Sequence, residues 1–169
     1  MVEWRNLAVL GFSKYSVSDE GVVRRDETGR TLTPVRTQRR ILRVNLYHDL
    51  TGDPMTVLIG RVVCEMFSTY RPSPDFNTVI YLDGNRSNVR ATNVMWRPRW
   101  FAVSYMRQTA NPLWHQRPHF RNVFLEETGE EFSSTVEASM RHGLLELDVV
   151  ASILTKDSVY PYWYHFGRL

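Results

Sequence analysis

The side chains with the clearest chemical meaning in this sequence are its arginines. The chain carries 21 basic residues, and all except Lys14 and Lys156 are arginine. A guanidinium group presents a planar fork of N–H donors, which matches phosphate oxygens and the edge of guanine better than a lysine ammonium does. So strong a preference for arginine predicts that the protein contacts a polyanion.

The arginines are concentrated in two stretches, one in the N-terminal part and one that begins at Gly84. From Gly84 to Leu125 the chain has no Asp or Glu, and aromatic residues such as Trp100 and Trp114 lie between the cations. A solvated surface normally mixes both signs of charge, so this acid-free stretch favours a polyanion-binding surface. The residues predicted to contact this polyanion are Arg36, Arg39, Arg40, Arg43, Arg86, Arg90, Arg97, Arg99, Arg107, Arg117 and Arg121.

The sign of the charge changes near Glu126. Residues 126–169 carry a net charge of −5, which leaves +8 on residues 1–125. The two ends of the chain are therefore expected to have different partners or roles. The acidic end includes an aromatic tail over residues 160–166, which either binds a protein partner or packs back on the core.

Thiol and metal chemistry are not expected. The single cysteine, Cys64, lies in an apolar stretch that is typical of a buried helix face, and no Cys-x-x-Cys pair exists. The five histidines are scattered, and only His115 and His119 have the i, i+4 spacing of a helical metal pair. Because Pro118 lies between them, we expect no helix and no metal site there.

The hydrophobic pattern predicts an α+β fold. Strands are expected within residues 1–25, where two or three form a small sheet, and at residues 40–47, 55–59 and 79–82. Helices are expected at residues 60–70, 100–108, 135–142 and 147–154, and residues 111–118 are expected to form an extended linker. Ser133 or Ser134 can cap the third helix, and Gly143 can end it.

No apolar run approaches the roughly 20 residues that cross a bilayer, and the N-terminus lacks the apolar core of a signal peptide. We therefore expect no membrane association and a cytoplasmic location, which is the host cytoplasm if the protein is phage-encoded.

Three stretches in the same order resemble phage HNH homing endonucleases. They are Glu3-Trp4-Arg5 with the following segment to Arg24, Val79 to Trp96, and Thr128 to Ala138. The collinear order is more specific than any one stretch. The resemblance implies a small β-rich N-terminal module (residues 1–40), a degenerate ββα-metal, HNH-like core (41–108), a linker (109–122) and a C-terminal helix-turn-helix module (123–169).

The resemblance also locates the positions at which the family holds one divalent metal ion and a histidine that activates water. Ile80 and Tyr81 occupy the metal-ligand and histidine positions in this sequence. Isoleucine cannot coordinate Mg²⁺, and a tyrosine with a pKa near 10 is a poor base at neutral pH. We therefore expect no catalytic residues, with Asn93 as a remnant of the site, and no cofactor, because Mg²⁺ is needed only if the nuclease is active.

The motif residues that are retained suit a structural role. Asp83, Gly84 and Asn85 are expected to form the turn, Asn88 and Asn93 to tie the loop together, and Trp96 to fill the core.

The leading hypothesis is a DNA-binding protein, derived from an HNH homing endonuclease and catalytically inactive, that acts as a phage transcription or replication factor. The first alternative is an active, metal-dependent nicking endonuclease. The second is an interaction factor that contacts a polymerase or another phage protein through the acidic C-terminal module. Whether that module also reads DNA stays open, because its net charge of −5 repels phosphate.

Overall fold

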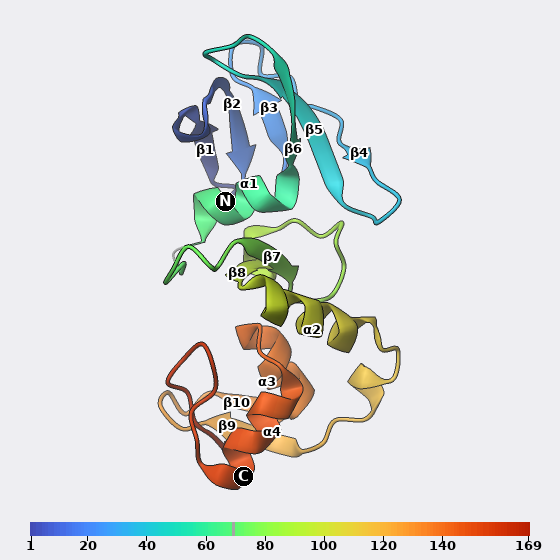
Figure 1. Ribbon diagram of the computed structural model, residues 1–169, viewed down its shortest axis with the longest axis vertical. Helices are drawn as coiled ribbons and strands as arrows, with labels where there is room; N and C mark the ends of the chain where they lie inside the picture. Colours follow the sequence, from blue (N-terminus) through green and yellow to red (C-terminus); the bar gives the residue numbers. More distant parts are fainter. Residues whose placement is uncertain (69) are drawn as a thin grey trace. The chain divides into compact units, whose positions relative to one another are not determined.

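The computed structural model describes residues 1–68 and 70–169 and has the predicted α+β fold (Figure 1). Thr69, at the end of the helix predicted over residues 60–70, lies outside the described residues. The chain forms two compact units. The first comprises residues 1–81 with 85–99, and the second comprises residues 82–84 with 100–169.

The first unit begins with a three-stranded antiparallel sheet of β1 (Trp4–Leu7), β2 (Phe12–Ser18) and β3 (Val23–Arg25) in the order β1-β2-β3. A short 3-10 helix, η1 (Ala8–Leu10), connects β1 to β2 and ends at Gly11, whose φ of 83° is accessible to glycine at little cost. The apolar side chains of these strands enter the core of the unit. They are Leu7, Phe12, Tyr15, Val17 and Val23.

A second antiparallel sheet contains β4 (Val35–Arg36), β5 (Leu42–Tyr47) and β6 (Pro54–Leu58) in the order β4-β5-β6. Val44 and Leu46 of β5 are buried, whereas the alternate residues are exposed, as expected for a strand with one face on the core. This alternation places Arg43 on the solvent face of the sheet.

Helix α1 (Ile59–Phe67) follows β6 directly and buries Val62, Val63 and Cys64. A two-stranded antiparallel sheet of β7 (Thr78–Tyr81) and β8 (Val94–Arg97) completes the unit, and η2 (Ala91–Asn93) precedes β8. Trp96 packs in the same cluster as the apolar residues of the N-terminal sheet and of β5. One hydrophobic core therefore joins the N-terminal sheet to β7 and β8.

The second unit contains α2 (Arg99–Ala110, of which Arg99 counts with the first unit), η3 (Trp114–Gln116), β9 (Arg121–Leu125), β10 (Glu131–Ser134), α3 (Thr135–His142), α4 (Glu146–Thr155) and β11 (Phe166–Arg168). The three strands form an antiparallel sheet in the order β10-β9-β11. Its core includes Leu125, Phe132, Leu144, Val149 and Phe166.

The boundaries of α3 agree with the prediction because its end signals are strong. The Ser134 side chain accepts a hydrogen bond from the Glu137 backbone N–H, and the Glu137 carboxylate accepts one from the Ser133 N–H at 2.7 Å. Gly143 ends the helix with φ 59°. These contacts satisfy backbone groups that the helix termini leave without a partner.

The extended linker predicted over residues 111–118 is wrong in its conformation. The segment contains η3, and Trp114 is buried, with its indole N–H donating to Glu146. An aromatic residue with a polar handle has packed the segment onto the second unit, which turn residues alone did not indicate. The predicted division of the chain into four parts is not tested by its two compact units and stays a prediction.

Among the described residues, no helix is both long and apolar enough to span a bilayer.

Gly21 tests how tightly the first unit is packed. Its φ is 81°, and a Cβ added there would collide with the side chain of Val89. Gly29 has a similar φ of 66° but open space around it, so it is a matched control. We expect Gly21→Ala to lower the free energy of unfolding by about 2–4 kcal/mol and Gly29→Ala by about 1 kcal/mol, measured by urea denaturation. Equal costs would show that Val89 moves aside freely.

Candidate nucleic-acid interface

The loop between β7 and β8 carries the HNH-like motif residues. Gly84 has a φ of 72°, the left-handed conformation that its tight turn requires. The Asn85 side chain accepts a hydrogen bond from the Ser87 N–H at 3.1 Å, and the Asn85 carbonyl accepts one from the Asn88 N–H at 2.9 Å. The Asn93 side chain donates to the Asn88 carbonyl at 2.8 Å. The side chains of Asn85 and Asn93 thus hydrogen-bond to the backbone of the loop and stabilise its conformation.

The same loop is tied to the rest of the first unit at two places. The Ala91 N–H donates to the Asp19 carbonyl at 2.7 Å, and Val89 packs against Gly21. The Ser87 hydroxyl donates to the carbonyl of Arg40 at 2.9 Å. The second contact holds the turn between β4 and β5, where the N-terminal arginines gather.

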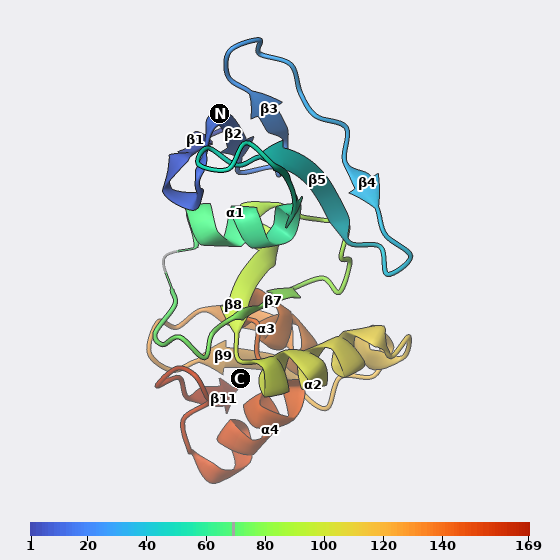
Figure 2. The same cartoon turned by 45° about the horizontal axis from the view of Figure 1, so that its top comes forward.

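A tight turn at residues 37–41 presents these arginines. The Thr37 N–H donates to the Ile41 carbonyl at 2.9 Å, the Thr37 hydroxyl oxygen accepts from the Ile41 N–H at 3.1 Å, and Arg40 has a φ of 62°. Arg36 is paired with Leu42 in the flanking strands. Figure 2 shows this β4–β5 hairpin extending to the side of the first unit, away from β1 and β2.

Four exposed arginines on this hairpin form the surface that we call the arginine hairpin. They are Arg36, Arg39, Arg40 and Arg43. None of the four forms an ion pair with any residue in the described part of the chain, whereas Arg24 and Arg25 pair with Asp26 and Glu27. A shallow cavity of about 300 Å³ adjoins Arg43 and is also lined by Val35, Asn45 and Thr56. The arginine hairpin therefore places exposed guanidinium groups next to a shallow cavity.

The arginines predicted from the acid-free stretch differ in availability. Arg99, Arg107, Arg117 and Arg121 are exposed, whereas Arg86 is half-buried. Arg90 is exposed and pairs with Glu20 at 3.7 Å.

The prediction that Arg97 contacts DNA is wrong. Its side chain is fully buried at the end of β8, and Nη1 donates to the Trp96 carbonyl at 2.8 Å. A guanidinium group without solvent-accessible surface cannot reach a phosphate.

The comparisons with known proteins agree with this architecture. A family model described as the NUMOD4 motif, which is associated with homing endonucleases, matches residues 3–47. The solved structure described as "DNA binding and cleavage by the HNH homing endonuclease I-HmuI" is 25% identical, covers 98% of this chain and 97% of that chain, and gives a TM-score of 0.53. The chain is built like an HNH homing endonuclease. No curated protein sequence matches the chain significantly.

The metal that the HNH scaffold implies does not fit the residues present. Ile80 is fully buried and has no donor atom. The hydroxyl of Tyr81 lies against Gly60 of α1, and burial raises its pKa above the ordinary value near 10. Asp83 is the only carboxylate between residues 80 and 96, and the described residues contain no cluster of three His, Cys, Asp or Glu side chains that could hold a metal ion.

Cys64 and His119 do not replace the missing side chains. Burial raises the pKa of the Cys64 thiol to about 12, so the thiolate is not available at neutral pH. His119 is half-exposed, and its Nδ1 lies 3.1 Å from a carboxylate oxygen of Glu146. That histidine belongs to a structural network, described next.

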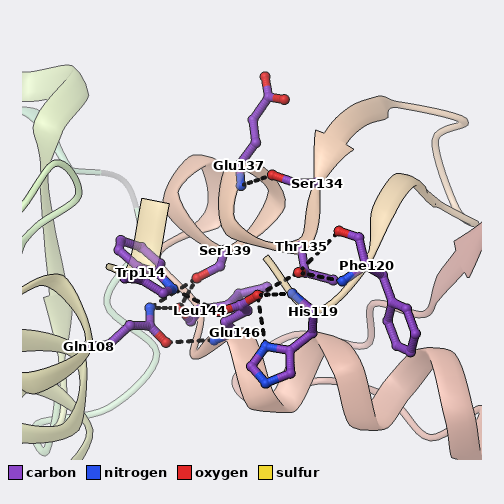
Figure 3. A network of polar contacts seen from close by, with 10 residues as sticks. All are labelled: Gln108, Trp114, His119, Phe120, Ser134, Thr135, Glu137, Ser139, Leu144 and Glu146. Carbon is purple, nitrogen blue, oxygen red and sulfur yellow. Dashed lines mark hydrogen bonds and ion pairs between the residues drawn. The ribbon is translucent and has the colours of Figure 1, made fainter. Parts of the chain in front are cut away.

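A buried carboxylate, Glu146, organises the second unit of this HNH-like chain (Figure 3). Its Oε2 accepts from Trp114 Nε1 at 2.9 Å, and its Oε1 accepts from the Thr135 hydroxyl at 2.6 Å and from the His119 N–H at 3.0 Å. The Glu146 N–H donates to Gln108 at 2.7 Å. The network joins α2, the segment before β9, α3 and α4.

The ionised form of Glu146 is stabilised by these donors. Burial acts to raise its pKa, but the hydrogen bonds from Thr135 and His119 outweigh burial and hold the pKa below its ordinary value. Sequence reasoning missed this network, and its only local signal is a pair of acids, Glu146 and Asp148, inside the otherwise apolar run Leu144–Val150.

Replacing Glu146 by Gln tests the network. The amide places an NH₂ group against either the Trp114 N–H or the donors at Oε1, so we expect a loss of about 2–4 kcal/mol at pH 7, measured by urea unfolding. A lowered pKa means that the carboxylate stabilises the fold above the unfolded-state pKa and stops doing so as pH falls through the folded-state pKa. The deficit of the variant should therefore shrink from about pH 5 towards pH 3.

The exposed Glu131 of β10 provides the control for this experiment. Glu131→Gln should change stability by less than about 0.5 kcal/mol at any of these pH values. A pH-independent deficit for Glu146→Gln would contradict the assigned role of the charge.

Proposed function

We propose that this chain binds double-stranded DNA on an HNH homing-endonuclease scaffold without cutting it, and that it acts as a phage transcription or replication factor. I-HmuI, the similar solved structure, is described as binding and cleaving DNA. The observation that carries the proposal is the arginine hairpin, four exposed cations without an ion-pair partner among the described residues.

Unpaired arginines favour phosphate binding because nothing must be broken first. Each phosphate neutralised by a guanidinium group releases condensed counterions, which is the main source of non-specific affinity for DNA. Arg90, by contrast, must give up Glu20, and Arg24 must give up Asp26. The hairpin is therefore the strongest candidate for the first contact with the duplex.

The exposed arginines after β8 extend this surface in the proposal. They are Arg99, Arg107, Arg117 and Arg121, and none of them forms an ion pair within the described residues. Arg86 and Arg90 join them as secondary contacts. Contacts of this kind position a protein on DNA.

The absence of cutting follows in the proposal from Ile80 and Tyr81. Hydrolysis of a phosphodiester at an HNH site needs a metal ligand set and a base, and these two side chains supply neither at neutral pH. The second candidate function, a nicking endonuclease with an altered site, is favoured by one observation: the related I-HmuI is described as cleaving DNA.

Salt dependence tests the arginine hairpin. The double variant Arg39→Ala, Arg43→Ala should bind a duplex about tenfold or more weakly near 0.1 M salt. It should also reduce the slope of log affinity against log salt by roughly 1.8, because each lost phosphate contact removes about 0.9. Gel shifts or fluorescence anisotropy across a salt series measure both quantities.

Arg141→Ala is the matched control, because Arg141 is exposed but paired with Glu130. It should leave the affinity and the slope unchanged. An unchanged slope in the double variant would remove the hairpin from the interface.

Cleavage is tested on supercoiled DNA that carries the protein's own genomic neighbourhood, with Mg²⁺ and then Mn²⁺. We expect a gel shift without nicks. Nicks that disappear in chelator and in the variant Asp83→Asn would instead establish the second candidate. A protein that neither shifts nor nicks this DNA would contradict both functions.

A further inference from the structure

Helix α4 has an apolar face that points to solvent. Leu147 and Leu154 are 65% and 67% exposed, and Ala151 is exposed between them. With the half-buried Val150, these residues follow the i, i+3, i+4, i+7 spacing of one helix face, which we call the α4 stripe. The opposite face, with Val149 and Ile153, is buried in the core. A surface helix in water normally carries polar residues on the side that α4 leaves apolar.

The α4 stripe is poorly suited to read DNA. Its residues offer no hydrogen-bonding side chain to a base edge and no cation to a phosphate. The nearest basic residue after the helix, Lys156, pairs with Glu126 at 3.2 Å. The helix pair that resembles a DNA-reading module therefore presents the wrong chemistry on its second helix.

The polar border of the stripe is negative. Asp148 is half-buried and forms no ion pair with a residue in the described ranges, and Asp157 lies just beyond the helix. Burial raises the pKa of Asp148, because a partly buried carboxylate is less well solvated than a free one. A cationic group next to Asp148 would compensate that desolvation.

We propose that the α4 stripe docks a basic amphipathic helix of a partner protein. The apolar face of such a helix would cover Leu147 and Leu154, and a Lys or Arg at its edge would meet Asp148. A second copy of this chain is a worse occupant, because it would bring the same acidic residues, Asp148 and Asp157, to the contact and no cation of the stripe to pair with them.

The probe for the test is a fluorescein-labelled peptide of about 18 residues, built from Leu and Lys with all Leu on one helical face. Its control is the same composition scrambled so that the periodicity is lost. By fluorescence anisotropy, the full chain should bind the amphipathic peptide at least about tenfold more tightly than the scrambled one. Binding should weaken as salt increases.

Two variants separate the stripe from general attraction. Leu147→Ser with Leu154→Ser should weaken peptide binding about tenfold or more, and Asp148→Asn should weaken it about threefold. Leu50→Ser, at a turn residue of the first unit that is 90% exposed, should have no effect. The exposed positions allow these changes without loss of the fold, which circular dichroism checks.

Three results would overturn the proposal. The first is equal peptide affinity in the wild type and the double leucine variant. The second is a dimer in sedimentation velocity that the double variant abolishes, because the occupant would then be a second copy. The third is a loss of duplex binding in that variant, which would show that α4 contacts DNA.

Discussion

The first unit depends on the loop that connects β7 to β8. Its backbone reaches the N-terminal sheet through the hydrogen bond from Ala91 to Asp19 at 2.7 Å, and the close approach of Val89 to Gly21 needs a residue without a Cβ. Trp96, which follows the loop, shares one core with that sheet. Because the loop also donates from Ser87 to Arg40, the same segment supports the turn that presents the arginine hairpin. The contacts of the β7–β8 loop therefore both complete the core of the first unit and position the arginine hairpin.

This arrangement explains how an HNH-like motif can be kept in part. Gly84 and Asn93 satisfy backbone demands, a positive φ and a hydrogen bond to the Asn88 carbonyl, which exist whether or not a metal ion is bound. Ile80 is fully buried and Tyr81 is partly buried against the core of the first unit, so both side chains contribute apolar surface to packing. Structural and chemical requirements separate along the motif, so the presence of its structural residues carries no evidence for catalysis.

Most local structure was predictable because its signals are local. The Ser133-Ser134 cap and Gly143 fix both ends of α3, and the alternation in β5 fixes its buried face. What failed depends on contacts between distant residues. Strand β11 pairs with β9, and the Trp114 indole N–H donates a hydrogen bond to Glu146. Arg97 is buried, although arginines are usually exposed. A charge pattern counts cations but does not say which of them packing has enclosed, so the predicted DNA-contacting set could not be separated into available and buried members.

The same distinction changes the meaning of the acidic end. Its net charge of −5 includes Glu146, whose carboxylate is enclosed by Trp114, Thr135 and His119 and does not act on the surface as a free charge. Lys156 and Arg141, which pair with Glu126 and Glu130, are already counted in that net charge. The second unit also combines an exposed apolar helix face with Asp148 at its border, a carboxylate that forms no ion pair within residues 1–68 and 70–169. In the two proposals, exposed arginines of the first unit that form no ion pair with a described residue suit phosphate, whereas the exposed leucines of the second unit suit another protein.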